Sequence, residues 1–224
     1  MHKQSRHKQS RGFMIALEGV DGSGKSGLAR SLSAALRDAG HEVLATHEPG
    51  GTEAGAALRK ILLASNAYDW TPTAELLLMN ASRRQHIDQV ILPALQAGKI
   101  VLCDRFVGST IAYQGAGRGL SEALILDLHR LTIEDLWPDL TLVLDLDPEI
   151  ALGRSRTRLQ QSQVDEGRFE ALDLAFHRRV RQSFLDQAAT LPAPYKIVDA
   201  DRPPEVVERE AFDQVSRVLA ERIT

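Results

Sequence analysis

The sequence predicts a single α/β domain in which helices flank a five-stranded parallel sheet. Five short apolar runs recur along the chain, and each is hydrophobic nearly throughout, which is typical of strands buried on both faces of a parallel sheet. Helical patterns separate these runs, and such alternation predicts a doubly wound sheet with right-handed connections. The 224 residues, 43% of them apolar, are enough for one sizeable core.

The strands are expected where the apolar runs stand. They read FMIAL at 13–17, EVLAT at 42–46, KIVLCD at 99–104, TLVLDL at 141–146 and YKIV at 195–198. The single cysteine, Cys103, lies in the third run, so we expect a buried, unreactive side chain, and one cysteine cannot form a disulfide within the chain.

The helices are bounded by residues that commonly start and stop helices. We expect one at 25–39 that ends at Gly40, one at 72–97 that follows Thr71-Pro72, and one at 121–134 that opens at Ser121. The others are expected at 52–64, at 148–187 with an interruption, and at 204–222. The interruption contains the polar stretch LQQSQVDEG at 159–167, which we interpret as a mobile flap.

Charge and hydropathy exclude several classes of function. The formal net charge is −3, but residues 1–12 carry four basic side chains and no acidic one, so residues 13–224 carry −7. That balance argues against a nucleic-acid partner. The repeat HKQSR HKQSR predicts a disordered basic tail at 1–12, ahead of a single domain at 13–224. No apolar run is long enough to span a membrane and no signal peptide is apparent, so we expect a cytoplasmic protein with no membrane partner.

The segment GVDGSGKS directly follows the first expected strand and opens a helix. It fits the phosphate-loop pattern GxxxxGK[ST] in the required context, so its backbone N–H groups can converge on phosphate oxygens at a helix N-terminus. The sequence therefore predicts a nucleoside triphosphate site. We expect Lys25 to reach the β- and γ-phosphates and Ser26 to hold Mg²⁺; the full set expected to bind ATP is Gly19, Gly22, Ser23, Gly24, Lys25 and Ser26.

A phosphate loop alone does not define a reaction. The only asparagines, Asn66 and Asn80, are each followed by Ala, which disfavours a GTPase with a guanine-reading NKxD motif. No strand ends in the Asp-Glu pair of a mechanical ATPase. Instead Asp104 and Arg105 end a buried strand, at the rim where open parallel sheets bind ligands. Asp104 can organise Mg²⁺, and the Arg105 guanidinium offers a bidentate fork to a second phosphate.

Six segments, in this order, resemble the bacterial thymidylate kinases from about Phe13 to the C-terminus: GVDGSGKS, HEPGGT (47–52), LLLMNASRRQH (76–86), CDRF (103–106), AYQGAGRG (112–119) and PDLTLVLDL (138–146). The resemblance implies a P-loop nucleoside monophosphate kinase fold with a short lid at about 154–168. It also implies a homodimer that uses Mg²⁺ and ATP to phosphorylate dTMP to dTDP on the route to dTTP.

The resemblance implies an acceptor subsite formed by Asp21, Glu48, Pro49, Arg59, Met79, Arg83, Arg105, Ser109, Tyr113 and Gln114. Asp21 would hydrogen-bond the sugar 3′-hydroxyl, while Arg105, supported by Arg59, would hold the acceptor phosphate. Arg83, Ser109 and Gln114 would contact the base. The ring of Tyr113 would crowd the 2′ position and so select deoxyribose.

The resemblance also bears on the catalytic cations. In this family the transition-state arginine comes from the phosphate loop or from the lid, and this loop offers only Gly22 and Ser23. The lid segment GRSRTRL supplies Arg154, Arg156 and Arg158, of which the first and last are spaced i, i+4 and share one helix face. The expected catalytic set is Lys25, Arg105, Arg158 and Arg154, with Arg158 as the first choice among the lid arginines.

Three departures from the family pattern leave alternatives open. Met79, followed by Asn80, stands where a phenylalanine usually stacks on thymine; His47 replaces an arginine; and Gly167 replaces a common Asp. The substitution at Met79 and Asn80 leaves open that the protein is a kinase that prefers dUMP or another pyrimidine deoxynucleotide. The three substitutions together leave open that the protein is a non-catalytic nucleotide-binding regulatory module.

Overall fold

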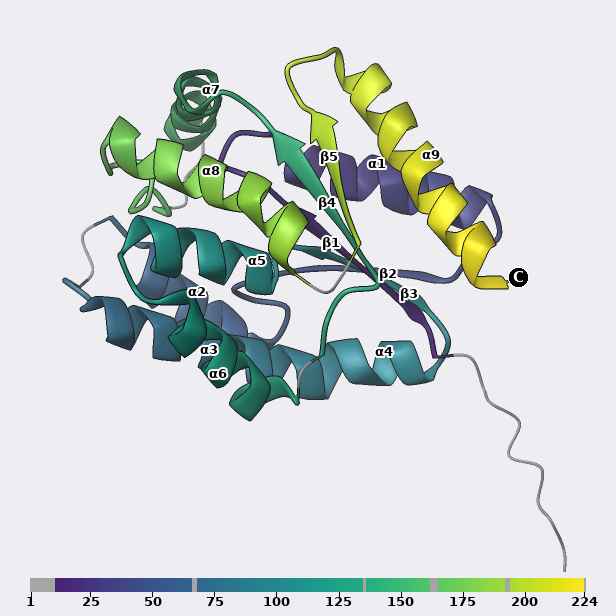
Figure 1. The fold of residues 1–224 in the computed structure, drawn as a ribbon, viewed down its shortest axis with the longest axis horizontal. Helices are drawn as coiled ribbons and strands as arrows, with labels where there is room; N and C mark the ends of the chain where they lie inside the picture. Colours follow the sequence, from purple (N-terminus) through teal and green to yellow (C-terminus); the bar gives the residue numbers. More distant parts are fainter. Residues whose placement is uncertain (1–10, 66–67, 135, 162–164, 192–193, 224) are drawn as a thin grey trace, which may run out of the picture.

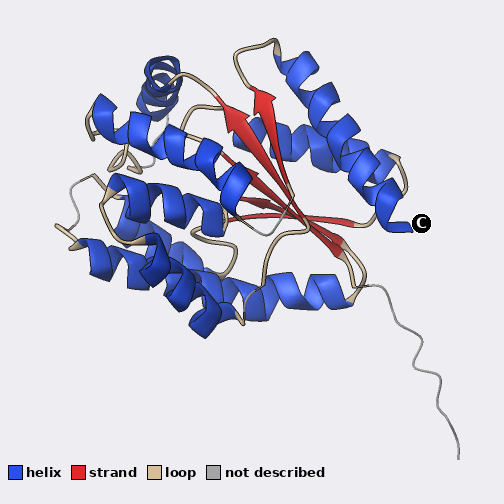
Figure 2. Cartoon of the chain, viewed as in Figure 1, coloured by secondary structure: helices blue, strands red, loops and turns tan. Residues whose placement is uncertain are grey.

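The structure is a computed structural model that describes residues 11–65, 68–134, 136–161, 165–191 and 194–223. Its centre is a five-stranded sheet with helices on both faces (Figures 1 and 2). Within these residues no helix is long and apolar enough to cross a membrane. The predicted tail at 1–12 lies almost wholly outside the described residues, as do positions 162–164 of the predicted flap.

The sheet has the order β2-β3-β1-β4-β5, and every neighbouring pair is parallel. The strands are β1 (Phe13–Glu18), β2 (Val43–His47), β3 (Ile100–Asp104), β4 (Leu140–Asp145) and β5 (Tyr195–Asp199). All five predicted strands are confirmed to within one residue at each end. The central position of β1 makes its carboxyl end the point where the strand order reverses, which is where ligands bind in open α/β sheets.

Two layers of helices cover the sheet (Figure 1). One face carries α1 (Lys25–Asp38) and α9 (Pro204–Ile223), which contact each other. The other carries α8 (Leu174–Thr190), the segment 107–117 and a long helix in which α3 (Pro72–His86), the π-helical turn η1 (Ile87–Ile91) and α4 (Leu92–Gln96) follow without a break. The remaining helices are α2 (Glu53–Leu63), α6 (Glu122–Ile133) and α7 (Pro148–Gln161).

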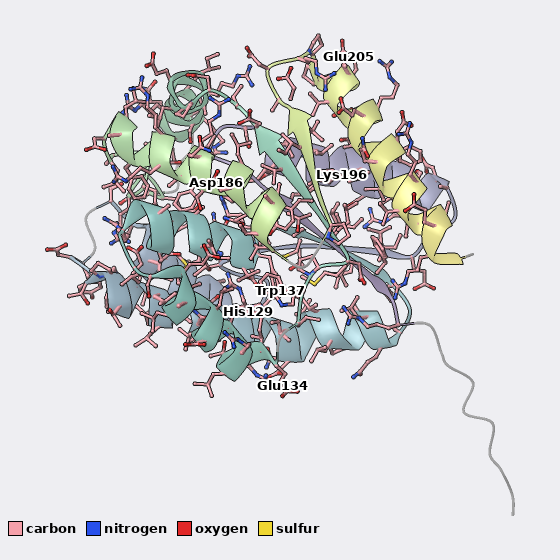
Figure 3. All side chains as sticks on the ribbon, in the orientation of Figure 1. His129, Glu134, Trp137, Asp186, Lys196 and Glu205 are labelled. Atoms are coloured by element: carbon pink, nitrogen blue, oxygen red, sulfur yellow. The ribbon has the colours of Figure 1, made fainter. Side chains whose placement is uncertain are left out.

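Side chains of β1 alternate between the two layers of core. Phe13, Ile15 and Leu17 belong to the cluster that includes α1 and α9, whereas Met14 and Ala16 belong to the cluster under α3 and α4. The second cluster extends to α6, where His129 packs on Trp137 with ring centroids 4.5 Å apart (Figure 3). This alternation explains why the strand sequences are apolar at nearly every position.

One helical segment was not predicted from the sequence. Residues 107–117 form α5 (Val107–Thr110) and the π-helical turn η2 (Ile111–Gly117). Glycines and β-branched residues make this segment a poor helix former. It forms because almost all of its residues through Gly115 are buried, and α8 packs directly against it. Tertiary packing therefore overrides local propensity here.

The predicted interruption after residue 158 separates two helices. Helix α7 runs on to Gln161, so the first three residues of the predicted flap are helical, and α8 begins only at Leu174. The side chain of Asp173 caps α8 by accepting from the backbone N–H of Phe176 at 2.7 Å. Of the residues between the two helices, 165–168 bond to α2 and to Ser65, and Phe169 and Glu170 lie in the interior.

Candidate active site

A cavity of about 770 Å³ opens at the carboxyl ends of β1, β2 and β3. Most of the residues predicted for the site line it: Asp21, Gly22, Gly24, Lys25, Ser26, Glu48, Pro49, Arg59, Met79, Arg83, Asp104, Arg105, Ser109, Tyr113, Gln114, Arg154 and Arg158. Gly19 and Ser23, also predicted to bind ATP, do not line it. These two residues of the loop face inward instead: the Gly19 carbonyl and the Ser23 hydroxyl accept hydrogen bonds from Lys25.

The phosphate loop has the conformation that its glycines permit. Gly22 and Gly24 have φ angles of 86° and 97°, and Gly24 is the N-cap of α1. The Lys25 ammonium donates to the carbonyls of Gly19 at 3.0 Å and Val20 at 2.8 Å. Burial, joined by the nearby Arg105 charge, lowers the pKa of Lys25 to about 8. The loop therefore encloses the Lys25 ammonium, and burial makes the charged form of that side chain less stable than it is in water.

We expect the affinity of the free protein for ATP to fall as the pH rises through about 8. The phosphates of ATP are fully ionised in this range, so the change reports the loss of the Lys25 proton. Below that pH the ammonium is charged and attracts the phosphates; above it the attraction is lost. Calorimetric titration of ATP across this range checks the prediction. Lys25→Arg is the control because a guanidinium keeps its charge; the same midpoint in that variant would contradict the assignment.

Ser26 and Asp104 form an oxygen pair beside the loop. The Ser26 hydroxyl donates to a carboxylate oxygen of Asp104 at 2.6 Å, although the residues are 78 positions apart. Asp104 ends β3, in register with Leu17 of β1 and His47 of β2. A hydroxyl and a carboxylate next to a phosphate loop are the oxygen ligands that Mg²⁺ takes. These residues fit the predicted metal.

Arg105 lies at the centre of the second subsite. Its guanidinium donates to Asp21 at 2.6 Å, to the Ser109 hydroxyl at 2.9 Å and to the Gly19 carbonyl at 3.1 Å. The Tyr113 hydroxyl donates to the other oxygen of Asp21 at 2.6 Å. Burial alone would raise the pKa of Asp21, but the charges of Arg105 and Lys25 hold it below its ordinary value. The pair is therefore fully ionised at neutral pH.

Glu18 supports this arrangement and was not predicted. The residue is completely buried at the end of β1. Its carboxylate accepts from the backbone N–H groups of Phe106 at 2.9 Å and Ser109 at 3.0 Å, and from the Ser109 hydroxyl at 2.6 Å. These bonds secure the backbone beside Arg105, whose φ of 74° is unusual for a residue with a side chain. The acid at the end of an otherwise apolar run was the signal in the sequence.

The far end of the cavity carries the residues predicted to contact a base. Arg83 is 4% exposed and donates to Glu48 at 2.6 Å, to the Thr110 hydroxyl at 2.9 Å and to the Phe106 carbonyl at 3.1 Å. Its remaining terminal nitrogen, Nη1, is buried without a partner among the described residues. A buried, unpaired donor that borders a cavity is suited to a ligand oxygen.

Only one of the two unusual residues on α3 borders the cavity. Met79 lines it, whereas Asn80 points to α6: its amide donates to the Leu76 carbonyl at 2.9 Å and accepts from the Thr132 hydroxyl at 3.4 Å. The polarity of Asn80 therefore does not reach the base end of the cavity. At the base end of the cavity, this chain therefore departs from the family pattern only at Met79, whose thioether stands in place of an aromatic ring.

Arg59 and His47 lie on the wall next to β2. Arg59 forms two hydrogen bonds with Glu166, at 2.7 and 2.6 Å, and one with the Pro49 carbonyl at 3.0 Å, so it connects the 47–52 loop to the segment after α7. Burial and the charge of Arg59 lower the pKa of His47 below its ordinary value of 6.5. His47 is consequently neutral at neutral pH.

Helix α7 brings two of the three lid arginines to the cavity. Arg154 donates to the Ala200 carbonyl and to Asp201, both at 3.3 Å. Arg158 is 58% exposed, donates to the Ser155 hydroxyl at 3.1 Å, and lies 3.7 Å from buried Glu170. Arg156 does not line the cavity. The predicted common face of Arg154 and Arg158 is confirmed.

Helix α7 lies directly against the phosphate loop. A Cβ atom at Gly22 would stand 2.0 Å from the Ala151 carbonyl oxygen in the first turn of α7. A residue with a side chain at position 22 would thus collide with backbone, and no rotamer change could relieve the contact. Gly22 is required for this packing as well as for its φ angle.

The fold and the site together define a P-loop phosphotransferase of the nucleoside monophosphate kinase type, with a phosphate loop and an arginine-lined acceptor subsite in one cavity. The family model for thymidylate kinase matches residues 17–211. The chain belongs to the thymidylate kinase family.

Individual relatives agree with this assignment. The thymidylate kinase of Cereibacter sphaeroides is 55% identical over 212 residues, which cover 95% of this chain and 98% of the relative. That of Nitratidesulfovibrio vulgaris is 49% identical, with 93% and 98% covered. The crystal structure of thymidylate kinase from Ehrlichia chaffeensis is 32% identical and superposes with a TM-score of 0.74 over 92% of this chain and 99% of that one.

Proposed function

We propose that the protein transfers the γ-phosphoryl group of ATP to dTMP, giving dTDP and ADP. The observation that carries this proposal is that one cavity holds both the phosphate loop and a second subsite built on Arg105 and Asp21. ATP would occupy the loop around Lys25, and the monophosphate would lie between Arg105 and the base end at Arg83. The family membership supports the same reaction.

Positioning and charge neutralisation account for the chemistry. The acceptor is a phosphate that is already an anion, so no general base has to create the nucleophile. Lys25 and Arg105 would hold the donor and acceptor phosphates, and Arg158 would swing in from α7 onto the transferring group. Asp21 would accept from the sugar 3′-hydroxyl, and Tyr113, fixed by its bond to Asp21, would close the 2′ side.

Ser26 and Asp104 would hold Mg²⁺, which supplies neutralising charge to the phosphate oxygens of ATP. The 2.6 Å bond between the two side chains supports their assignment to one ion beside the loop.

A panel of acceptors tests the proposal and its alternatives. ADP formation from ATP should be fastest with dTMP and slower with dUMP, dCMP and dGMP, and Lys25→Ala should serve as the blank. One missing methyl group costs at most about 200-fold in a hydrophobic pocket, so dUMP is the informative competitor. Preference for dUMP would establish the pyrimidine alternative motivated by Met79. Activity at the blank level with all four would establish the non-catalytic binding module.

We also propose a homodimer formed through α3 and α6. These helices lie side by side, and Arg84 of α3 donates to the Thr132 carbonyl of α6 at 2.9 Å. Three of their leucines face outward: Leu77 is 53% exposed, Leu124 44% and Leu131 81%. Leu124 and Leu131 are spaced i, i+7 and so share one face of α6. A two-fold interface would cover this face with the same face of a second copy.

Leu131→Glu is expected to shift the protein towards monomer. Two-fold symmetry would place one new carboxylate on each side of the interface, and each would be buried unpaired against the partner's leucines at a cost of several kcal/mol. We expect the dimer dissociation constant to rise on the order of 10²-fold or more. Sedimentation velocity over a concentration series measures it. Ile197→Glu is the control: Ile197 is an apolar residue of similar size on β5, 47% exposed, and its substitution should leave association unchanged. An equal effect of both variants would argue against an interface at α3 and α6.

A further inference from the structure

Glu75 is a completely buried carboxylate next to the base end of the cavity. It lies in the first turns of α3, one helical turn before Met79 and two before Arg83. One of its oxygens, Oε1, accepts from the side-chain amide of Gln114 at 2.8 Å. Oε1 also accepts a longer bond from Arg118 Nε at 3.4 Å. The other oxygen, Oε2, pairs with Arg168 at 2.6 Å and with Arg118 Nη2 at 3.2 Å. Three segments distant in sequence therefore meet at this one side chain.

The carboxylate determines which way the Gln114 amide faces. An ionised carboxylate only accepts hydrogen bonds, so the NH₂ group of Gln114 must face Glu75. The carbonyl oxygen of that amide is then directed away from Glu75. Gln114 lines the cavity, and its Oε1 has no hydrogen-bond partner among the described residues. The base end of the cavity thus combines a fixed acceptor, from Gln114, with the unpaired donor of Arg83.

This acceptor and donor match one class of pyrimidine. Thymine and uracil present a carbonyl at C4 and an N–H at N3, which suit the Arg83 donor and the Gln114 acceptor. Cytosine presents an amino group at C4 and an unprotonated N3, so both contacts would be mismatched. A site with buried hydrogen-bonding groups rejects a mismatched ligand strongly because its own groups remain unpaired.

We propose that Glu75 is a positioning residue that holds the Gln114 amide in one orientation and thereby sets the preference for bases with an N3–H donor over cytosine. The proposal rests on the proposed function and deepens it. Arg168 makes the carboxylate immobile, because its side chain also donates to the Leu62 carbonyl and its backbone to the Leu63 carbonyl, both at 3.2 Å. The orientation is consequently fixed from α2 as well as from α3.

Glu75→Gln tests this directly. The oxygen of the new amide should take the place of Oε2, which has the shortest contact with a charged donor, Arg168 at 2.6 Å. Its NH₂ group then takes the place of Oε1 and faces Gln114. Two NH₂ groups cannot pair, and Gln114 should turn over and present a donor to the base. We expect the ratio of kcat/KM for dTMP to that for dCMP to fall roughly tenfold or more, mainly through a higher KM for dTMP. An unchanged ratio, with both substrates slowed equally, would show a merely structural role and overturn the proposal.

Two further variants separate specificity from stability. Arg118→Gln removes the two longer bonds of Glu75, at 3.2 and 3.4 Å, and leaves the 2.8 Å bond from Gln114 in place. The ratio should therefore stay within about twofold of that of the original protein. The double variant Glu75→Gln/Gln114→Glu reverses the pair and restores an acceptor-only oxygen next to the base, so the ratio should recover. Failure to recover in a folded double variant, checked by thermal melting, would also count against Glu75. Absence of turnover with dTMP in the original protein would refute the proposed function instead.

Discussion

Arg105→Ala should lower kcat by at least about 10³-fold while changing the dissociation constant of ATP little, as expected for an arginine that stabilises phosphoryl transfer. The side chain is 15% exposed and lies between Asp21, Ser109 and the Gly19 carbonyl, on the acceptor side of the loop. Its removal takes away the charge that would hold the acceptor phosphate and leaves the Asp21 carboxylate to repel that phosphate. Lys25 and the glycines of the loop remain in place for ATP.

Steady-state rates with dTMP and calorimetric titration of ATP measure the two quantities separately. Arg105→Ala/Asp21→Asn distinguishes repulsion from lost attraction, because it removes the uncompensated carboxylate as well. Arg178→Ala, which loses only an exposed ion pair with Glu149, is the control for a generic arginine deletion. Loss of ATP binding together with activity in Arg105→Ala would place Arg105 in the donor site and contradict the assignment.

Arg158→Ala should have an effect of similar size, roughly 10³- to 10⁵-fold in kcat, with small changes in the KM values. The Arg158 side chain is mostly exposed, and its contacts with Ser155 and Glu170 are few, so it is free to move onto the transferring phosphoryl group. An interaction made only in the transition state lowers kcat without weakening substrate binding.

Arg156→Ala is the matched control because Arg156 belongs to the same helix and carries the same charge but does not border the cavity. We expect it to retain activity within a few-fold. Pre-steady-state turnover should be measured for both variants, so that slow product release does not conceal the chemical step. If Arg154→Ala rather than Arg158→Ala carries the large loss, the choice between these two lid arginines is wrong.

The sheet could be predicted closely because the three central strands β1, β3 and β4 are buried almost throughout and are mostly apolar. The edge strands β2 and β5 are more exposed, but their apolar residues still marked them. The segment 107–117 could not be predicted, since its glycines and β-branched residues favour no helix and only the cover of α8 makes it one. The cause of that helix lies about 70 residues further along the chain. Local sequence does not contain such information.

The candidate site divides in the same way. Ser26, Asp104 and Arg105 could be predicted because motifs and strand ends mark them, and the resemblance supplied the acceptor residues. The supporting acids Glu18 and Glu75 were missed, since each is explained only by partners from distant segments. A signal was nevertheless present for Glu75: it shares the i, i+4, i+8 face of one helix with Met79 and Arg83.

The contact between Gly22 and the Ala151 carbonyl also limits how this active site could evolve. An arginine at position 22 would need space that the backbone of α7 occupies, so an arginine at that position and a helix seated here exclude each other. A lineage could not transfer the role from α7 to position 22 by one substitution, because that step would displace the helix that carries the lid arginines. The close approach of the loop backbone at Gly22 to the α7 backbone at Ala151 therefore keeps the proposed catalytic arginines on α7 rather than at position 22.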